Sequence, residues 1–293
     1  MKLQRENQSK AIVFALACVV SWAFIPVVSR FGQQTLDNYQ FLFWSNLLSS
    51  VVLLFATVIS GRAKIFTTYN LLDLANTTIL GFLGSFLYYL LLYFAYAHAK
   101  GLEVLALQYT WPIFIVLFSI LLLRERLTRN ILLATLMGFV GVLIVLTKGN
   151  ITQVYLGNVT TDLLVLLAAA VFGLFSVLSK KVNFEPYTAT TLFFASATVF
   201  SFIAMKALST LVVPTASSMT PLLINGVFIN GISYILWLKA LSFAKASFVA
   251  QFVFLTPVLA ALLIVVFFHE IFTPIYLLGM CLVVGAGIMA QRK

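Results

Sequence analysis

Charged residues are scarce in this chain of 293 residues. Asp, Glu, Lys and Arg together make up 9% of it, whereas soluble globular domains carry about 25%. Hydrophobic residues make up 62%, so a soluble fold would have too little polar surface to cover itself. A bilayer suits this composition, because a spanning helix is apolar outside and satisfies its own backbone hydrogen bonds. The composition excludes a disordered or disulfide-stabilised chain and predicts an all-α integral membrane protein.

Cysteine and histidine are nearly absent. The two cysteines, Cys18 and Cys281, both lie inside apolar runs, which favours small core residues over a disulfide or a metal pair. The two histidines, His98 and His269, stand at the ends of apolar runs. The chain has no HExxH, no CxxC, no glycine-rich phosphate loop and no clustered acid pair. We therefore expect no metal site, no cofactor and no enzymatic activity.

Basic residues outnumber acidic ones, 18 to 8, and the net charge is +10. Nucleic-acid binding would need a basic cluster, but these residues stand singly or in small groups between apolar runs, as orientation signals of membrane proteins do. With the charged residues as boundaries, ten apolar segments remain, each close to the ~20 residues that a spanning helix needs. The sequence therefore predicts ten transmembrane helices, an uncleaved first span and no nucleic-acid partner.

The distribution of Lys and Arg between the short loops predicts the orientation. With ten spans, 14 Lys and Arg residues fall on one side of the membrane, together with both ends of the chain, and 4 fall on the other. Cytoplasmic loops carry the excess of basic residues. We therefore expect a multi-pass protein of the cell (inner or plasma) membrane with both termini in the cytoplasm.

The second half of the chain repeats a pattern of the first. The pattern recurs 145 positions later, from Ala99-Lys100, Pro112, Glu125 and Thr128 to Ala244-Lys245, Pro257, Glu270 and Thr273. Each half, residues 1–148 and 149–293, then holds five spans, and an odd number of spans inserts the second half upside down. Inverted repeats of this kind are typical of secondary transporters, whose substrate site lies near the membrane midplane where the halves meet.

The repeated segments carry a resemblance to a known family. Gln108-Tyr109-Thr110-Trp111-Pro112, the acidic motif at Glu125 and its recurrence at Glu270 resemble the drug/metabolite transporter superfamily, and within it the EamA-type transporters, over essentially the whole chain. The resemblance implies ten helices, a central cavity and export of small metabolites such as amino acids. The Tyr-x-Trp-Pro segment is similar to the aromatic amino-acid exporter branch, which implies that Tyr109 and Trp111 line the cavity. Gln108 and Thr110 depart from that branch, where Asn and Leu are common.

Two prolines fall near the middle of spans four and nine, at Pro112 and Pro257. Proline removes an intrahelical hydrogen bond and tends to kink a helix. Near the midplane such a bend can turn a carbonyl toward a cavity or serve alternating access. We expect both prolines to mark functional helix bends; packing kinks are the alternative, because proline is more frequent in membrane helices than in soluble ones.

Aromatic and amide side chains within the spans are the candidate substrate-binding residues. Aromatic rings give a cavity a flat apolar wall, and Tyr and Trp add a polar group. Polar side chains within spans usually face the bundle interior. The interfacial aromatic belt, the bundle core and interhelical hydrogen bonding are the alternatives. The candidates are Trp22, Tyr89, Tyr93, Gln108, Tyr109, Trp111, Phe172, Tyr234, Trp237 and Gln251.

Acidic residues are missing from the middle of every span. Glu125 and Glu270 stand at helix ends, where we expect them to cap a helix, to pair with arginines or to gate the cavity rim. A proton or sodium pathway usually shows a carboxylate within the membrane. Uniport or facilitated efflux is therefore the plainer expectation.

The leading hypothesis is a secondary transporter that exports small organic metabolites, with amino acids, aromatic ones included, as the favoured substrates. A sugar-nucleotide or phosphate-ester carrier is an alternative; it needs cationic cavity residues, and only Lys206 and Lys239 qualify, both near span ends. An integral-membrane lipid-modifying enzyme is another, but no acid, His or Ser groups converge. The expected partners are a small-molecule substrate and the lipid bilayer. The sequence leaves monomer and homodimer open.

Overall fold

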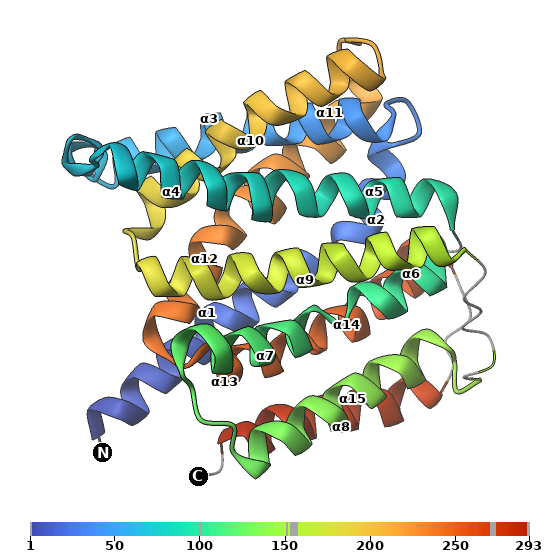
Figure 1. Cartoon of the computed structure of the whole chain (residues 1–293). Helices are drawn as coiled ribbons and strands as arrows, with labels where there is room; N and C mark the ends of the chain where they lie inside the picture. The colour runs from blue at the N-terminus through green and yellow to red at the C-terminus, as the bar shows by residue number, and fades with distance from the viewer. Residues whose placement is uncertain (1, 100, 151, 153–157, 270–273, 292–293) are drawn as a thin grey trace.

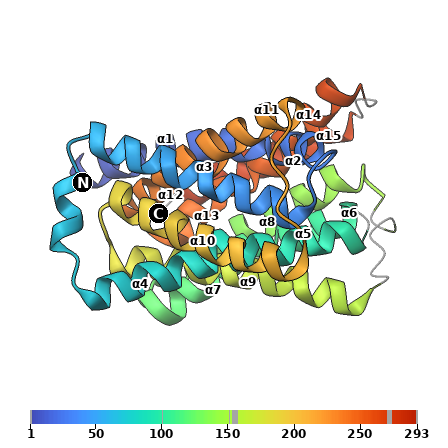
Figure 2. The ribbon, with the colours of Figure 1, turned by 90° about the horizontal axis from the view of Figure 1, so that it is seen from above.

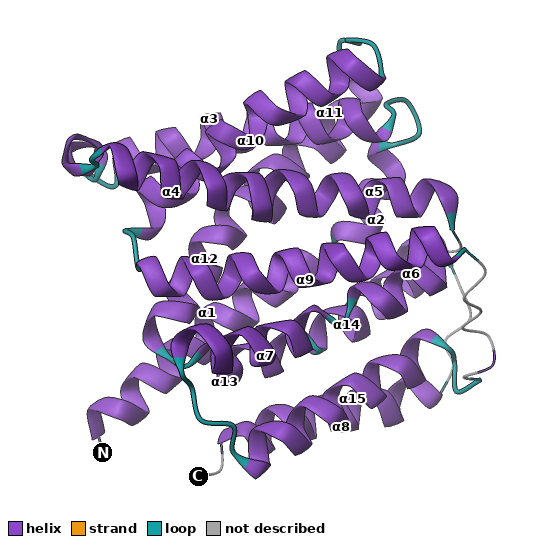
Figure 3. Ribbon diagram, in the orientation of Figure 1, coloured by secondary structure: helices purple, strands orange, loops and turns teal. Residues whose placement is uncertain are grey.

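The computed structural model describes residues 2–99, 101–150, 152, 158–269 and 274–291, and within these ranges the chain forms helices and no strand (Figure 3). Two elements, η2 and η4, are π-helical and η1 is a 3-10 helix. In chain order the elements are α1 (Lys2–Ala23), α2 (Ile25–Gly32), α3 (Asn38–Ile59), η1 (Ala63–Thr68), α4 (Leu71–Gly81), η2 (Phe82–Leu87), α5 (Tyr88–His98), α6 (Gly101–Gln108), α7 (Trp111–Leu123), α8 (Arg129–Leu146), α9 (Val159–Val182), α10 (Pro186–Leu208), α11 (Ala216–Ile224), η4 (Asn225–Ile232), α12 (Ser233–Phe243), α13 (Ala246–Val253), α14 (Leu255–Phe268) and α15 (Ile275–Gln291).

Nine helical stretches of the described chain are long and apolar enough to cross a membrane, and α15 adds a shorter apolar helix of 17 residues. The stretches lie side by side, with the beginning of α1 and the end of α15 at the same end of the bundle (Figure 1). We call this the terminal end and the opposite one the far end. A multi-span helical membrane protein, expected from the sequence, is what the structure describes.

Three of the spans are interrupted just before a proline: α1 gives way to α2, α6 to α7 and α13 to α14. Each proline, at Pro26, Pro112 or Pro257, stands in the first turn of the second helix. Proline lacks the N–H that the preceding turn would accept, and its ring clashes with the carbonyl four residues earlier. The helix therefore stops before the proline and starts again, with the break at Phe24 in the first span, at residues 109–110 in the second and at Phe254 in the third.

Two further spans carry a π-helical segment in the middle. The first, η2, lies between α4 and α5, and the second, η4, lies between α11 and α12. Their positions nearly coincide under the 145-residue offset of the repeat. A π turn breaks the regular i to i+4 hydrogen bonding and is frequent at functional sites.

Helices of the two halves of the sequence interleave (Figures 1 and 2). Helix α3 packs along α10, and α8 packs along α15. A Cβ atom on Gly279 would lie 2.7 Å from the carbonyl oxygen of Gly141, so these glycines let α8 and α15 approach closely. Helix α1 packs against α12, while α9 packs against α5 and α7. These contacts bring five helices around the centre of the bundle.

Candidate functional site

Seven aromatic side chains meet where α1, α5, α7, α9 and α12 surround the bundle centre. The ring centroids of Trp22 and Trp237 lie 5.4 Å apart, and those of Trp22 and Trp111 lie 5.8 Å apart. Tilted and edge-to-face pairs at such distances are the favourable arrangement for aromatic rings. We call this group the aromatic cage; its members, all buried, are Trp22, Tyr88, Tyr89, Trp111, Phe172, Tyr234 and Trp237.

Hydrogen bonds between helices hold two indoles of the cage in place. Trp22 Nε1 donates to Ser233 Oγ at 2.8 Å, and Trp237 Nε1 donates to Ser176 Oγ at 3.1 Å. Both bonds are buried. A polar group left alone in an apolar interior is costly, so each serine fixes the orientation of its tryptophan.

One interrupted span and one π-helical segment form hydrogen bonds with tyrosines of the cage, and the groups involved are polar and uncharged. Gln108, the last residue of α6, donates from Nε2 to the hydroxyl of Tyr88 at 2.8 Å. The Tyr234 hydroxyl donates to the carbonyl of Gly84, within η2, at 2.9 Å. The π segment thus supplies the cage with a backbone carbonyl, and the end of α6 supplies it with a side-chain amide.

A small void of about 20 Å³ lies against the cage. Such a void holds about one water molecule, far less than the ~300 Å³ of the smallest typical ligand sites. The cage is therefore closed, and a substrate could enter only if the aromatic rings of the cage move apart. No charged side chain stands among the described residues that line the void, which are Trp22, Ile25, Tyr88, Tyr89, Gln108, Tyr109, Trp111, Phe172 and Thr256.

The structure gathers all but two of the predicted binding residues at the cage and its void. Tyr93 is buried one turn from Tyr89, with ring centroids 5.6 Å apart, and does not line the void. Gln251 is turned toward α8, where its Nε2 donates to Thr135 Oγ1 at 3.0 Å and to the carbonyl of Ser247. These two side chains lie outside the cage.

Three residues at the void, Ile25, Tyr88 and Thr256, were absent from the sequence-based candidates, and two of them are polar. Tyr88 receives the Gln108 hydrogen bond. The buried Thr256 Oγ1 has no hydrogen-bond partner among the described residues. A signal for Thr256 existed, because it precedes Pro257 as Trp111 precedes Pro112, at the 145-residue offset.

Glu125 links the two halves at the terminal end. Its carboxylate accepts the backbone N–H groups of Ala246 at 2.8 Å and Ser247 at 3.1 Å, and the Ser247 hydroxyl at 2.5 Å. These residues begin α13, whose first N–H groups have no partner within the helix and favour a negative charge. The buried Glu125 thus caps a helix of the other half. Its counterpart, Glu270, lies outside the described residues.

A larger groove of about 590 Å³ lies between α1, α2, α11, η4 and α14, on the side of the far end. Its volume is in the range of small-molecule sites. Val20, Ser21 and Phe24 border the groove, whereas Trp22 and Ile25 border the void, so the interruption between α1 and α2 separates the two spaces. The groove is mostly apolar; its lining is Val20, Ser21, Phe24, Val27, Val28, Phe31, Gln34, Ser217, Thr220, Pro221, Ile224, Phe228, Ile229 and Phe267.

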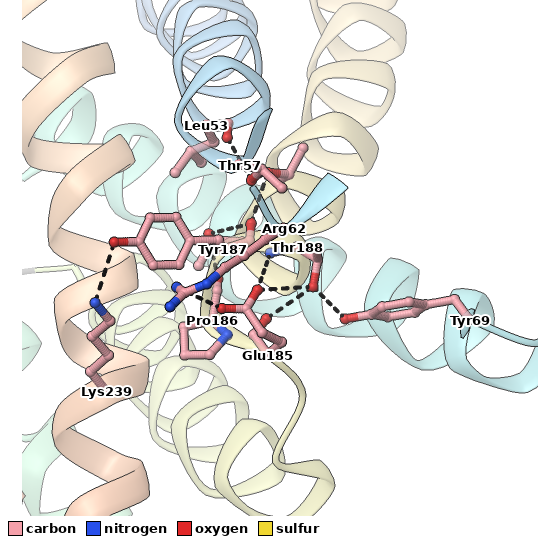
Figure 4. Close-up of polar contacts among 11 residues, drawn as sticks. Leu53, Thr57, Arg62, Tyr69, Glu185, Pro186, Tyr187, Thr188 and Lys239 are labelled. Atoms are coloured by element: carbon pink, nitrogen blue, oxygen red, sulfur yellow. Dashed lines mark hydrogen bonds and ion pairs between the residues drawn. The ribbon is translucent and has the colours of Figure 1, made fainter. Parts of the chain in front are cut away.

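Charged and aromatic side chains form a network at the terminal end, beside the start of α10 (Figure 4). Arg62, which follows α3, pairs with Glu185 at 3.0 Å, and its guanidinium lies 4.2 Å from the ring centroid of Tyr187. Lys239, on α12, donates to the Tyr187 hydroxyl at 3.3 Å. The sequence pattern did not group these residues, because they come from three separate segments and no motif joins them.

Tyr69 and Thr188 extend this network. The Tyr69 hydroxyl lies 3.0 Å from Thr188 Oγ1, and the Thr188 N–H donates to the Glu185 carboxylate at 2.9 Å. Burial raises the pKa of Tyr69, while the hydrogen bond with Thr188 lowers it. The phenol is thus neutral at physiological pH.

The sequence of each half matches one family. The family model described as "EamA-like transporter family" matches residues 9–147 and, separately, residues 159–290. The chain belongs to the EamA-like transporter family. Membership makes it a transporter of small metabolites in a lipid bilayer, and the EamA resemblance noted from the sequence is confirmed.

Individual relatives of this EamA-like transporter span most of its length. An uncharacterized transporter of Archaeoglobus fulgidus is 23% identical, over 87% of this chain and 88% of that protein. A protein of Rickettsia prowazekii named "S-adenosylmethionine uptake transporter" is 23% identical, over 88% and 84%. A crystal structure shares the fold with a TM-score of 0.85 at 20% identity, covering 97% of this chain and 98% of that one.

Proposed function

We propose that this EamA-like transporter moves small organic metabolites with a flat, uncharged ring, by alternating access through the aromatic cage. The lining of the void carries the proposal, because it combines rings with neutral polar groups and no charge. Rings stack on flat ligands, while the amide of Gln108 and the free hydroxyl of Thr256 can bind the polar edge of such a ring. Export of aromatic amino acids fits this chemistry, and so does transport of compounds with a purine ring, as the name of the Rickettsia relative indicates for that protein.

An amino acid also carries an ammonium and a carboxylate, and the interrupted spans offer groups for both. The turns before Pro112 and Pro257 leave carbonyls without their usual helical donors. The helices that follow, α7 and α14, begin there and present N–H groups that attract anions. Discontinuous spans of this kind bind substrates near the midplane in other secondary transporters.

We infer that the chain has ten spans in two inverted five-helix repeats, residues 1–148 and 149–293, with α15 as the tenth span. The two separate family matches support this division. The paired interruptions and the paired π segments support it as well. So do the helix ends at Arg124 and His269, which adopt left-handed backbone with φ of 55° and 54°.

From the excess of basic residues at the terminal end we infer that this end faces the cytoplasm and that the chain lies in the plasma membrane. In this orientation the structure is closed at the cytoplasmic end, where Glu125 and the Arg62 network lie, and is hollowed at the external end by the 590 Å³ groove. We infer that a shift of α2 would join the groove to the cage. Glu125 and Glu270 would act at the rims of the pathway.

A phosphate-ester carrier is the weaker alternative. It needs a cation at the substrate site, but Lys206 is exposed near the end of α10, and Lys239 contacts Tyr187 and Phe14. Neither lysine lines the void.

Counterflow in liposomes tests the proposal. Purified protein is reconstituted with one internal compound, and uptake of the labelled external compound is followed for aromatic amino acids, purine compounds, aliphatic amino acids and a sugar phosphate. Exchange of ring compounds only is the expected result. Exchange of none, or of the sugar phosphate alone, with folded protein would contradict it. An uncoupler added to the same vesicles shows whether a proton gradient drives the flux.

A further inference from the structure

Two loops clasp the first turns of α3 and α10 from opposite ends of the molecule. Residues 60–70, between α3 and α4, contact the start of α10 at the terminal end; we call them the terminal strap. Residues 209–215, between α10 and α11, contact the start of α3 at the far end; we call them the far strap. Because α3 and α10 also pack along each other, the straps fasten opposite ends of one helix pair.

The terminal strap is held by a cation. Arg62 forms the ion pair with Glu185 at 3.0 Å, with side-chain exposures of 38% and 21%, and covers the ring of Tyr187. Both interactions involve partly desolvated groups, which strengthens them relative to fully exposed pairs. At the other end of the strap, Tyr69 is joined to Thr188.

A second cation, Lys239, contacts Tyr187 on the side that faces the bundle centre. The Lys239 ammonium lies 4.8 Å from the ring centroid of Tyr187 and 5.4 Å from that of Phe14, on α1. Figure 4 shows Arg62 and Lys239 reaching Tyr187 from different segments. Tyr187, on α10, therefore contacts cations of the strap and of α12, and Lys239 extends the connection to α1.

The far strap uses different chemistry at the equivalent place. Asp37 caps α3 as Glu185 caps α10, and the Ser209 hydroxyl donates to the Asp37 carboxylate. Gln40 Nε2 donates to the carbonyl of Thr210 at 2.9 Å. Trp44 Nε1 donates to a further strap carbonyl, that of residue 212, at 2.8 Å. These contacts are hydrogen bonds, whereas the terminal strap adds an ion pair and cation–ring contacts.

We propose that the terminal strap is a salt-sensitive lock that keeps the terminal end closed, and that Arg62 must leave Glu185 and Tyr187 before that end opens. The proposal rests on alternating access as proposed above. Opening the terminal end requires the strap to separate from α10. Ion pairs between partly exposed groups weaken as salt screens them, so the lock weakens with ionic strength more than the far strap, whose described residues form no ion pair.

Cysteine labelling at the terminal end tests the lock. In a Cys281→Ser background, where the remaining Cys18 is buried, Ser179→Cys places a thiol at a buried site at the terminal end of α9. Arg62→Gln should raise its labelling by an impermeant maleimide at low salt about threefold or more, and Arg62→Lys should restore most of the protection. Raised salt should increase labelling in the parent and have little effect in Arg62→Gln.

Two matched variants control for general loosening. Arg126→Gln removes an exposed arginine at the same end, and Gln40→Met weakens the far strap; neither should raise Ser179→Cys labelling. The proposal would be overturned if Ser179→Cys were labelled at the parent rate in Arg62→Gln, or if Gln40→Met raised the labelling rate as much as Arg62→Gln does. If Arg62→Gln fails to fold, Tyr187→Leu tests the same lock by removing the ring that both cations contact.

Counterflow measured on the same variants separates the two proposals. A lack of counterflow in the parent, with the labelling response intact, rejects the transport mechanism and keeps the lock. Normal counterflow with no labelling response in Arg62→Gln or Tyr187→Leu rejects the lock and keeps the transport mechanism.

Discussion

Removing the carboxylate of Glu125 should destabilise the whole bundle, because this residue ties α7 to the start of α13. The carboxylate accepts two backbone N–H groups and the hydroxyl of Ser247, all buried. Loss of a helix cap costs about 0.5–2 kcal/mol, and leaving buried donors without acceptors costs about 1–3 kcal/mol. We expect Glu125→Ala to lower the free energy of unfolding by about 2–4 kcal/mol, and Glu125→Gln, which keeps one acceptor oxygen, by about half of that.

Thermal unfolding of the purified protein in detergent measures this effect through Tm. Glu6→Gln is the matched control, since Glu6 forms an exposed pair with Lys10 at side-chain exposures of 58% and 48%, and such pairs contribute little. Its Tm should stay near that of the parent. Equal Tm values for Glu125→Ala and Glu6→Gln would refute the view that Glu125 is a buried cap between the halves.

Two further substitutions test the cage and its support. Trp111→Ala should reduce counterflow at least about tenfold by removing one wall of the cage, while Phe55→Ala, at a side chain 66% exposed on α3, should leave it unchanged; equal flux in both would remove Trp111 from the pathway. Gly84→Ala should destabilise the protein by about 1–3 kcal/mol, because a Cβ would lie 2.4 Å from the ring of Phe175. Gly285→Ala, which meets only a methionine methyl group at 3.3 Å, should have a Tm near that of the parent, and similar losses in both variants would contradict the packing argument.

The sequence predicted the membrane class and the family, because the length of apolar runs is set by the bilayer and the proline–glutamate pattern is specific. It did not predict the π segments. Phe82–Leu87 lies within an apolar run, and Asn225–Ile232 contains two Asn and two Gly, which favour a helix less but do not specify a π turn. The widened turns depend on packing with neighbouring helices, which spacing along one chain does not encode.

The candidate site shows the same limit at the level of single residues. Gln251 and Gln108 were both predicted as amide side chains within a span, but the equivalent of Gln108 at the 145-residue offset is Val253. A displacement of two residues turns a side chain about 200° around a helix, and Gln251 accordingly faces α8. Thr256 is at the position equivalent to Trp111. It was not predicted, because the candidates were aromatic and amide side chains and threonine has a small hydroxyl side chain.

The central claim is that substrate binds within the aromatic cage, and tryptophan fluorescence measures this directly. Three of the four tryptophans, Trp22, Trp111 and Trp237, belong to the cage, and the fourth, Trp44, contacts the far strap. In a Trp44→Phe variant all tryptophan emission comes from the cage. A compound that exchanges in counterflow should change this emission saturably, over the concentration range that half-saturates transport. Unchanged emission at saturating concentrations of a transported compound would contradict the claim.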